Sequence, residues 1–162
     1  MTVDPLVPAR EGKVDTVIGG NRFAQVEYAL PRTAASAGWA RCMTREFLGV
    51  RGERRGGADR LDMTVTPRRA GVDDAELVVS ELVANAAQHG SSACRLRLRA
   101  GVGRLVVEVH DDNSTMPVRR NVGEAAERGR GLLLVRALAD RVRVSPGRDG
   151  GKTVMAVLPV GA

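Results

Sequence analysis

The stretch VVSELVANAAQHG, residues 78–90, decides the fold because it combines a buried helical face with two polar residues one turn apart. Apolar residues in and just before it recur at the spacing of an amphipathic core helix: Ala75, Val78, Val79, Leu82, Val83 and Ala86. Glu81 and Asn85 lie four residues apart, so both side chains leave the same side of that helix, at the margin of the core. A carboxylate there can accept a proton, and an amide oxygen suits Mg²⁺. A polar helix edge that faces water is the simpler interpretation.

A second segment, RLVVEVHDDNSTMP at residues 104–117, predicts a half-buried strand that ends at an acid. Leu105, Val107 and Val109 alternate with residues of the opposite face, and Asp111 keeps their parity. Asp111 is therefore expected to point toward the core or a pocket, where a buried charge requires hydrogen-bond donors. The amino group of adenine is one such donor. An acidic turn at the end of the strand is the alternative.

A third segment, ERGRGLLLVRALADRV at residues 127–142, places Gly129 and Gly131 before an apolar helical stretch. Glycines at a helix N-terminus leave backbone N–H groups open, which predicts a site for a phosphate group. A flexible loop explains the same glycines without any ligand. Neither GxGxxG nor GxxxxGK[ST] occurs, so the Rossmann and Walker patterns are excluded.

In this order the three segments resemble the N, G1 and G2 boxes of the GHKL ATPases, the superfamily that includes gyrase and the histidine kinases. The resemblance covers roughly residues 26–158. Within the superfamily, the helix SELVANAAQHG, the D-x-N-x-x-x-P turn and the segment GRGLLLVRALAD are most similar to the anti-sigma factor serine kinases of bacteria.

The resemblance implies roles for individual residues. Glu81 would be the general base, Asn85 the Mg²⁺ ligand and Asp111 the acceptor for the adenine amino group. Gly129 and Gly131 would lie in the loop over the phosphates, and Thr153 would support the adenine pocket beside Asp111. The full set of nucleotide-binding residues that it implies is Asn85, Asp111, Asn113, Gly129, Arg130, Gly131, Leu132 and Thr153.

Two stretches depart from the family pattern. The usual G1 box is D-x-G-x-G, whereas residues 111–115 read DDNST. Glycine lets the backbone approach adenine closely, so Asn113 in its place is expected to narrow the pocket or weaken affinity. The last strand carries Lys152 and Thr153 where many members have a Gly-Thr pair.

The order of the segments predicts an α+β two-layer sandwich of the GHKL (Bergerat) ATP-binding type, with a mixed, mostly antiparallel sheet and helices on one face. We expect a flexible N-terminal tail over residues 1–22 and one ATP-binding domain over 23–162. Strands are predicted at 26–30, 93–100, 103–110 and 152–159, and a short one at 61–65. Helices are predicted at 34–48, from Asp73 and Asp74 to Gly90, and at 131–140. The connection 114–128 is expected to be a mobile lid over the phosphates.

Composition limits the function classes. The chain has 162 residues, 43% of them apolar and only 2% aromatic, which predicts one domain with an aliphatic core and argues against stacking platforms for single-stranded nucleic acid. The net charge is +6, but Arg95, Arg97 and Arg99 alternate along a strand rather than on a recognition helix, so no direct nucleic-acid binding is expected. Cys42 and Cys94 are predicted to be reduced core thiols of a cytoplasmic protein, and no signal or membrane segment is expected.

Two function classes follow. In the first, the protein uses ATP and Mg²⁺ to phosphorylate a serine of an anti-anti-sigma (STAS-like) antagonist, sequesters a sigma factor and forms a homodimer, as the resemblance implies. In the second, it is a non-catalytic GHKL-fold interaction module with weak or no nucleotide binding. Glu81 with Asn85 favours the enzyme, whereas the altered G1 box favours the module.

Overall fold

A computed structural model describes residues 9–18, 21–49, 69–115 and 130–161. Its strands are β1 (Ala9–Ile18), β2 (Asn21–Leu30), β3 (Cys94–Gly101), β4 (Arg104–Asp111), β5 (Arg141–Pro146) and β6 (Lys152–Pro159). Its helices are α1 (Ser36–Phe47), α2 (Arg69–His89) and α3 (Arg130–Leu138).

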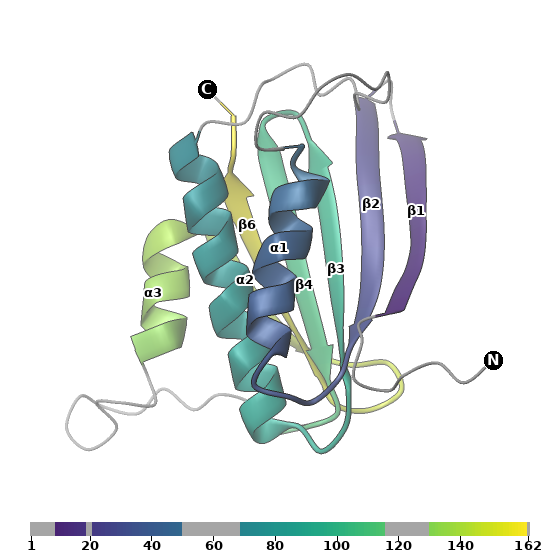
Figure 1. The fold of residues 1–162 in the computed structure, drawn as a ribbon, viewed down its shortest axis with the longest axis vertical. Helices are drawn as coiled ribbons and strands as arrows, with labels where there is room; N and C mark the ends of the chain where they lie inside the picture. Colours follow the sequence, from purple (N-terminus) through teal and green to yellow (C-terminus); the bar gives the residue numbers. More distant parts are fainter. Residues whose placement is uncertain (1–8, 19–20, 50–68, 116–129, 162) are drawn as a thin grey trace.

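The strands form one sheet in the order β1-β2-β3-β4-β6-β5, and every neighbouring pair among them is antiparallel. The helices lie together on one face of this sheet (Figure 1). This arrangement confirms the predicted α+β two-layer sandwich, with antiparallel pairing throughout the described strands. Among the described helices, none is long and apolar enough to cross a membrane.

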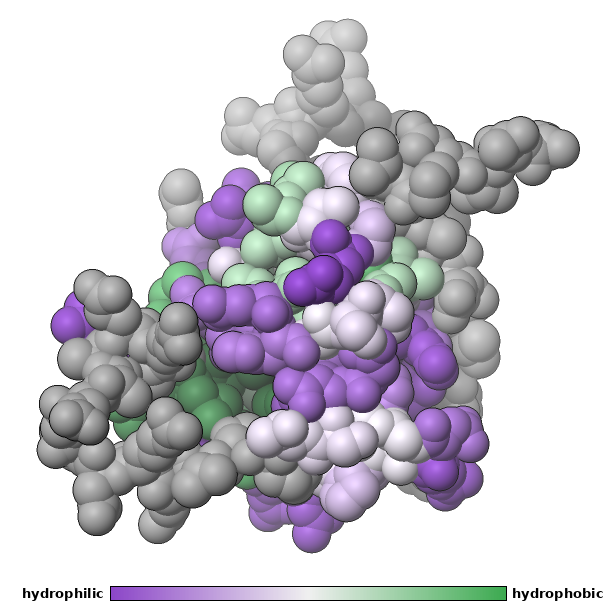
Figure 2. Space-filling model, turned by 90° about the horizontal axis from the view of Figure 1, so that it is seen from below, coloured by the Kyte–Doolittle hydropathy of each residue, from purple (hydrophilic) through white to green (hydrophobic). Residues whose placement is uncertain are grey.

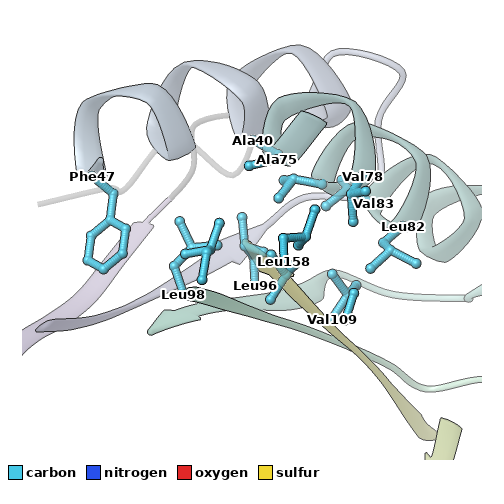
Figure 3. Packing of buried hydrophobic residues seen from close by; sticks show 14 of the residues in the cluster. Ala40, Phe47, Ala75, Val78, Leu82, Val83, Leu96, Leu98, Val109 and Leu158 are labelled. Carbon is cyan, nitrogen blue, oxygen red and sulfur yellow. The ribbon is translucent and has the colours of Figure 1, made fainter. Parts of the chain in front are cut away.

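The core lies between the sheet and the helices and is almost entirely aliphatic. All six residues of the predicted apolar face of α2 are buried. They pack with residues of the strands and of α1 (Figure 3), among which are Leu96, Leu98, Val109, Leu158, Ala40 and Phe47. Trp39 of α1 is only half-buried.

Glycines end both long helices as predicted. Gly49 has a φ of 74°, and its N–H donates to the carbonyl of Glu46 at 3.0 Å, a left-handed helix end that favours glycine. Gly90 follows α2, and its N–H donates to the carbonyl of Ala86 at 2.8 Å. A Cβ atom at Gly90 would lie 2.7 Å from that carbonyl oxygen, so the close approach requires glycine.

The start of α2 differs from the prediction. The helix begins at Arg69 rather than at the acids Asp73 and Asp74, which therefore lie in its second turn. Val72 in the added turn is buried in the core, and this packing favours helix beyond the point where capping signals would start it. The favourable interaction of the two acids with the helix dipole is correspondingly weaker.

The uncovered face of the sheet carries a row of charges in register. Arg97 of β3 lies between Glu27 of β2 and Glu108 of β4, which are its direct partners on the two sides. Its Nε atom donates to Glu27 at 2.7 Å, and Nη1 lies 3.6 Å from the Glu108 carboxylate. Arg95 and Arg99 flank it on the same strand face, at 3.6 Å from Glu27 and 3.5 Å from Glu108. The prediction that these arginines alternate along a strand is confirmed, and they lie on the face without helices.

Two strands were missed or misassigned. Residues 9–18, expected in the flexible tail, form β1 and pair with β2, which starts at Asn21. The β-branched run VDTVI at 14–18 favours a strand, and pairing satisfies its backbone groups. Residues 141–146 form the edge strand β5, where no strand was predicted between the helix at 131–140 and the strand at 152–159. Residues 1–8 and the proposed strand at 61–65 lie outside the described residues.

Candidate functional site

Segments far apart in the sequence meet at one end of the molecule, the lower end in Figure 1. Helix α2 and strand β4 end there, whereas α3 and β6 begin there. Figure 2 looks onto this end and shows mostly hydrophilic residues beside a recessed apolar patch. Among the described residues, every one to which the sequence assigns chemistry lies on one of these elements or directly follows β4.

Glu81 and Asn85 on α2 meet the first turn of α3. Both side chains are half-buried, at the margin of the core where the sequence placed them. A Cβ atom added at Gly131 would collide with the carboxylate of Glu81 and would lie 3.8 Å from Nδ2 of Asn85. The structure therefore brings these three residues together. Glycine at 131 leaves space for the backbone of α3, whose first N–H groups lack partners within the helix, to lie against both polar groups.

Asp111 at the end of β4 points inward, as its parity predicts, and only 4% of it is exposed. Its donors come from the protein itself. Oδ1 accepts a hydrogen bond from the Lys152 ammonium at 3.0 Å and another from the backbone N–H of Asn113 at 2.8 Å. Lys152 also donates to the carbonyl of Asn113 at 3.0 Å. A buried ion pair thus occupies the position expected for recognition of adenine.

Lys152 lies where the sequence interpretation placed Thr153. In the register of β4 and β6, Lys152 is the partner of Asp111 and Thr153 the partner of His110. The Thr153 hydroxyl and His110 Nδ1 are 3.1 Å apart, on the uncovered face of the sheet. Thr153 is therefore not beside the Asp111 side chain, which corrects the expectation. The available signal was the inward parity of Ala156 and Leu158, which Lys152 shares.

Asn113 replaces the glycine of the family pattern, and its side chain fixes the turn. Oδ1 accepts from the N–H of Thr115 at 2.9 Å, and Nδ2 donates to the carbonyl of His89 at the end of α2 at 3.1 Å. The turn after β4 is therefore fastened to the helix that carries Glu81 and Asn85. The asparagine that departs from the family pattern thus has a structural role in this turn, which a glycine could not fill.

Asp112 fastens the same turn from its other side. Its Oδ1 accepts from the backbone N–H of Ser91 at 2.8 Å, and its Oδ2 from the Ser91 hydroxyl. These hydrogen bonds, the hydroxyl first and then the N–H, lower the pKa of Asp112 to about 2. On the β6 side, the N–H of Gly151 donates to the Ser114 hydroxyl at 3.2 Å. Residues 111–114 are thus held by both neighbouring segments.

The remaining candidates are placed only in part. Arg130 is exposed at the start of α3 and Leu132 is half-buried. Gly129 and all of the expected lid except residues 114 and 115 lie outside the described residues. Among the residues described, no group of three or more His, Cys, Asp or Glu side chains could hold a metal ion. An open hollow lined by Arg104, Asp140, Arg141 and Val157 lies toward the opposite end of β4 and β6.

The two cysteines are free, but only Cys94 is a core thiol. Cys42 is exposed on α1, which corrects the expectation for that residue. Burial, and next the negative charge of Asp111, raise the pKa of Cys94 from 9.0 to about 11. Both effects favour the neutral thiol in the folded protein.

The raised pKa predicts a loss of stability at high pH. Below pH 9 the thiol is protonated in both states and its contribution is fully present; between about pH 9 and 11 only the unfolded chain loses the proton. We expect this group to lower the free energy of unfolding by about 2–3 kcal/mol across that window. Urea denaturation of Cys94→Ala should show a correspondingly shallower pH dependence than the parent, whereas Cys42→Ala should follow the parent. Parallel curves for all three proteins would contradict the assignment.

Comparison with known proteins agrees with this geometry. Residues 44–158 match the family model described as a histidine kinase-like ATPase domain, a range that includes Glu81, Asn85, Asp111 and Gly131. No curated protein matches the chain at a significant level.

Proposed function

Because the chain belongs to the histidine kinase-like ATPase family, we propose that it binds Mg-ATP and acts as a protein serine kinase in the cytoplasm. Its substrate in this proposal is a serine of an anti-anti-sigma antagonist, and it sequesters a sigma factor as a homodimer. The observation that carries the proposal is the close approach of Glu81 and Asn85 to Gly131. In this arrangement the proposed base and the proposed metal ligand lie beside a helix N-terminus, which is suited to binding anions.

The residues present fit Mg-ATP. Asn85 offers an amide oxygen to the metal, and the open N–H groups of the first turn of α3 suit phosphate oxygens. Asp111 uses Oδ1 for its contacts with the described residues, which leaves Oδ2 as an acceptor for the adenine amino group. Mg-ATP, when bound, supplies the phosphoryl group. Glu81 takes the proton of the acceptor serine hydroxyl, and Gly131 allows its carboxylate to lie against α3.

A calorimetric titration with ATP, with and without Mg²⁺, tests the proposal. Asn85→Ala should weaken Mg²⁺-dependent binding by about tenfold or more, since even outer partners of a metal site contribute 10–100-fold. Without Mg²⁺ the variant and the parent should bind alike. The matched control is Gln88→Ala, which removes an exposed amide from the same helix. Equal affinities of Asn85→Ala and Gln88→Ala in Mg²⁺ would exclude the metal role.

Gly131→Ala should impair transfer more than folding. The added methyl group meets the end of the Glu81 side chain, which can rotate away, so the change in unfolding free energy should stay within about 1 kcal/mol. The displaced carboxylate is expected to slow transfer by about 10²-fold, the usual effect of a 1 Å misplacement. Gly38→Ala is the control, because a Cβ at Gly38 in α1 meets nothing within 4 Å. A parental transfer rate in Gly131→Ala would show that the contact does not position the base.

Two observations favour the non-catalytic interaction module. The Lys152 ammonium already donates to Asp111, and Asn113 replaces the glycine of the family pattern. If the parent protein bound neither ATP nor ADP at millimolar concentrations, with or without Mg²⁺, the kinase proposal would fail and the module would be the better account.

A further inference from the structure

Lys152 is a buried cation with more N–H donors than hydrogen-bond acceptors among the described residues. Only 7% of the residue is exposed, and its ammonium donates to Asp111 Oδ1 and to the Asn113 carbonyl, each at 3.0 Å. An ammonium group has three N–H donors, and these two are its hydrogen-bond partners within the described part of the chain. A buried donor without an acceptor is energetically unfavourable, so we expect a bound ligand to accept a hydrogen bond from the third N–H.

The position of the pair indicates which acceptor fits. Lys152 and Asp111 are direct cross-strand partners, so an N–H donor and a carboxylate acceptor lie side by side at the end of the sheet. The Watson–Crick edge of adenine has the complementary pattern, because its amino group donates a hydrogen bond and the neighbouring ring atom N1 accepts one. Both contacts that the described residues make with Asp111 fall on Oδ1, so Lys152 can remain in place while Oδ2 accepts from a ligand.

We propose that Lys152 donates a hydrogen bond to ring atom N1 of the bound purine and is a specificity-determining residue of the site. This inference rests on the proposed ATP-binding function. It gives the ion pair a role in reading the base, with Asp111 accepting from the amino group and Lys152 donating to its neighbour. In this arrangement Lys152 and adenine use different oxygens of Asp111, so the buried ion pair does not prevent binding of the base.

The first test changes one atom of the ligand and nothing in the protein. In 1-deaza-ATP a C–H group replaces N1, so the proposed acceptor is lost. Because hydrogen bonds to charged groups are among the stronger ones, we expect the Kd of the unaltered protein to rise by about 10- to 100-fold. In 7-deaza-ATP the acceptor N7, on another edge of the base, is lost instead, and binding should match that of ATP within about threefold.

The second test asks whether Lys152 is the donor. Lys152→Met, shown to be folded by circular dichroism, should bind ATP and 1-deaza-ATP with equal affinity. Thr153→Val, the neighbour on the opposite face, should discriminate as the parent does. If Lys152→Met does not fold, the ligand comparison on the unaltered protein decides alone.

The outcomes separate the two proposals. Equal affinity of the unaltered protein for ATP and 1-deaza-ATP overturns the role of Lys152 and leaves ATP binding intact. Tighter binding of GTP than of ATP also overturns it, because Lys152 would then donate to O6 and Asp111 would accept from N1–H. Failure to bind ATP at all overturns the proposed function together with this inference.

Discussion

Asp111→Asn is expected to lower the free energy of unfolding by about 3–5 kcal/mol, the usual result of removing one partner from a buried ion pair. The substitution keeps the shape of the side chain but leaves the Lys152 ammonium buried without its counter-charge. The amide can also present an N–H group to a cation that only donates. Urea denaturation at pH 7, followed by circular dichroism, measures the loss.

A double substitution separates the pair from its surroundings. Adding Lys152→Met to Asp111→Asn removes the buried charge that the single substitution leaves without a partner, so the double variant should recover part of the lost stability. Asp112→Asn is the matched control on the next residue, whose side chain is exposed, and its loss should be clearly smaller than that of Asp111→Asn. A loss below about 1 kcal/mol in Asp111→Asn would show that the pair does not hold this end of the sheet. Nucleotide affinities of Asp111 variants are therefore meaningful only at temperatures where the variant is folded.

Glu81→Gln is expected to leave ATP binding nearly unchanged and to slow phosphoryl transfer by about 10²- to 10⁴-fold, the range for a positioned general base. The amide fills the same space against Gly131 but cannot take the proton of a serine hydroxyl. Transfer of labelled phosphate to a cognate antagonist, at saturating Mg-ATP, measures the rate.

Glu76→Gln provides the control for this experiment. Glu76 lies five positions earlier on α2 and pairs with Arg45 of α1, so its loss removes a helix carboxylate away from the contact with Gly131. Its transfer rate should stay within about threefold of the parent rate, since an exposed pair contributes little to stability. If Glu81→Gln transferred phosphate as fast as Glu76→Gln, Glu81 would not be the base.

Much of the fold could be predicted because periodicity and burial agree. The apolar spacing of α2 reports its core face directly, and the alternation in β4 carries Asp111 inward with the same parity as Val109. Strand β5 could not be predicted in the same way. It is a short edge strand with Arg141 and Arg143 exposed, and its pattern depends on pairing with β6 more than on its own burial.

Part of the candidate site could likewise be predicted from the sequence, and part could not. The family resemblance predicts the contact of Gly131 with Glu81 and Asn85. It assigns all three residues to one nucleotide site, and the helical spacing of Glu81 and Asn85 puts both side chains on the same side of their helix. The parity of β6 indicates that Lys152 points inward, but its pairing with Asp111 depends on the register between β4 and β6, which no single segment encodes. A choice between Lys152 and Thr153 is a choice between the two faces of a strand, and a one-residue difference reverses it.

The charge row on the uncovered sheet face has a consequence for how the chain finds its native pairing. Glu27, Arg97 and Glu108 stand opposite one another, and Arg95 and Arg99 share their face, so a two-residue slip of β4 against β3 would keep the apolar residues inward and still place Glu108 opposite an arginine. The same slip would carry Asp111 away from its place beside α2. The alternating charges therefore do not select the alignment of β3 with β4, which depends instead on the two-residue turn at Val102 and Gly103, whose φ values of 53° and 71° fit a tight hairpin connection.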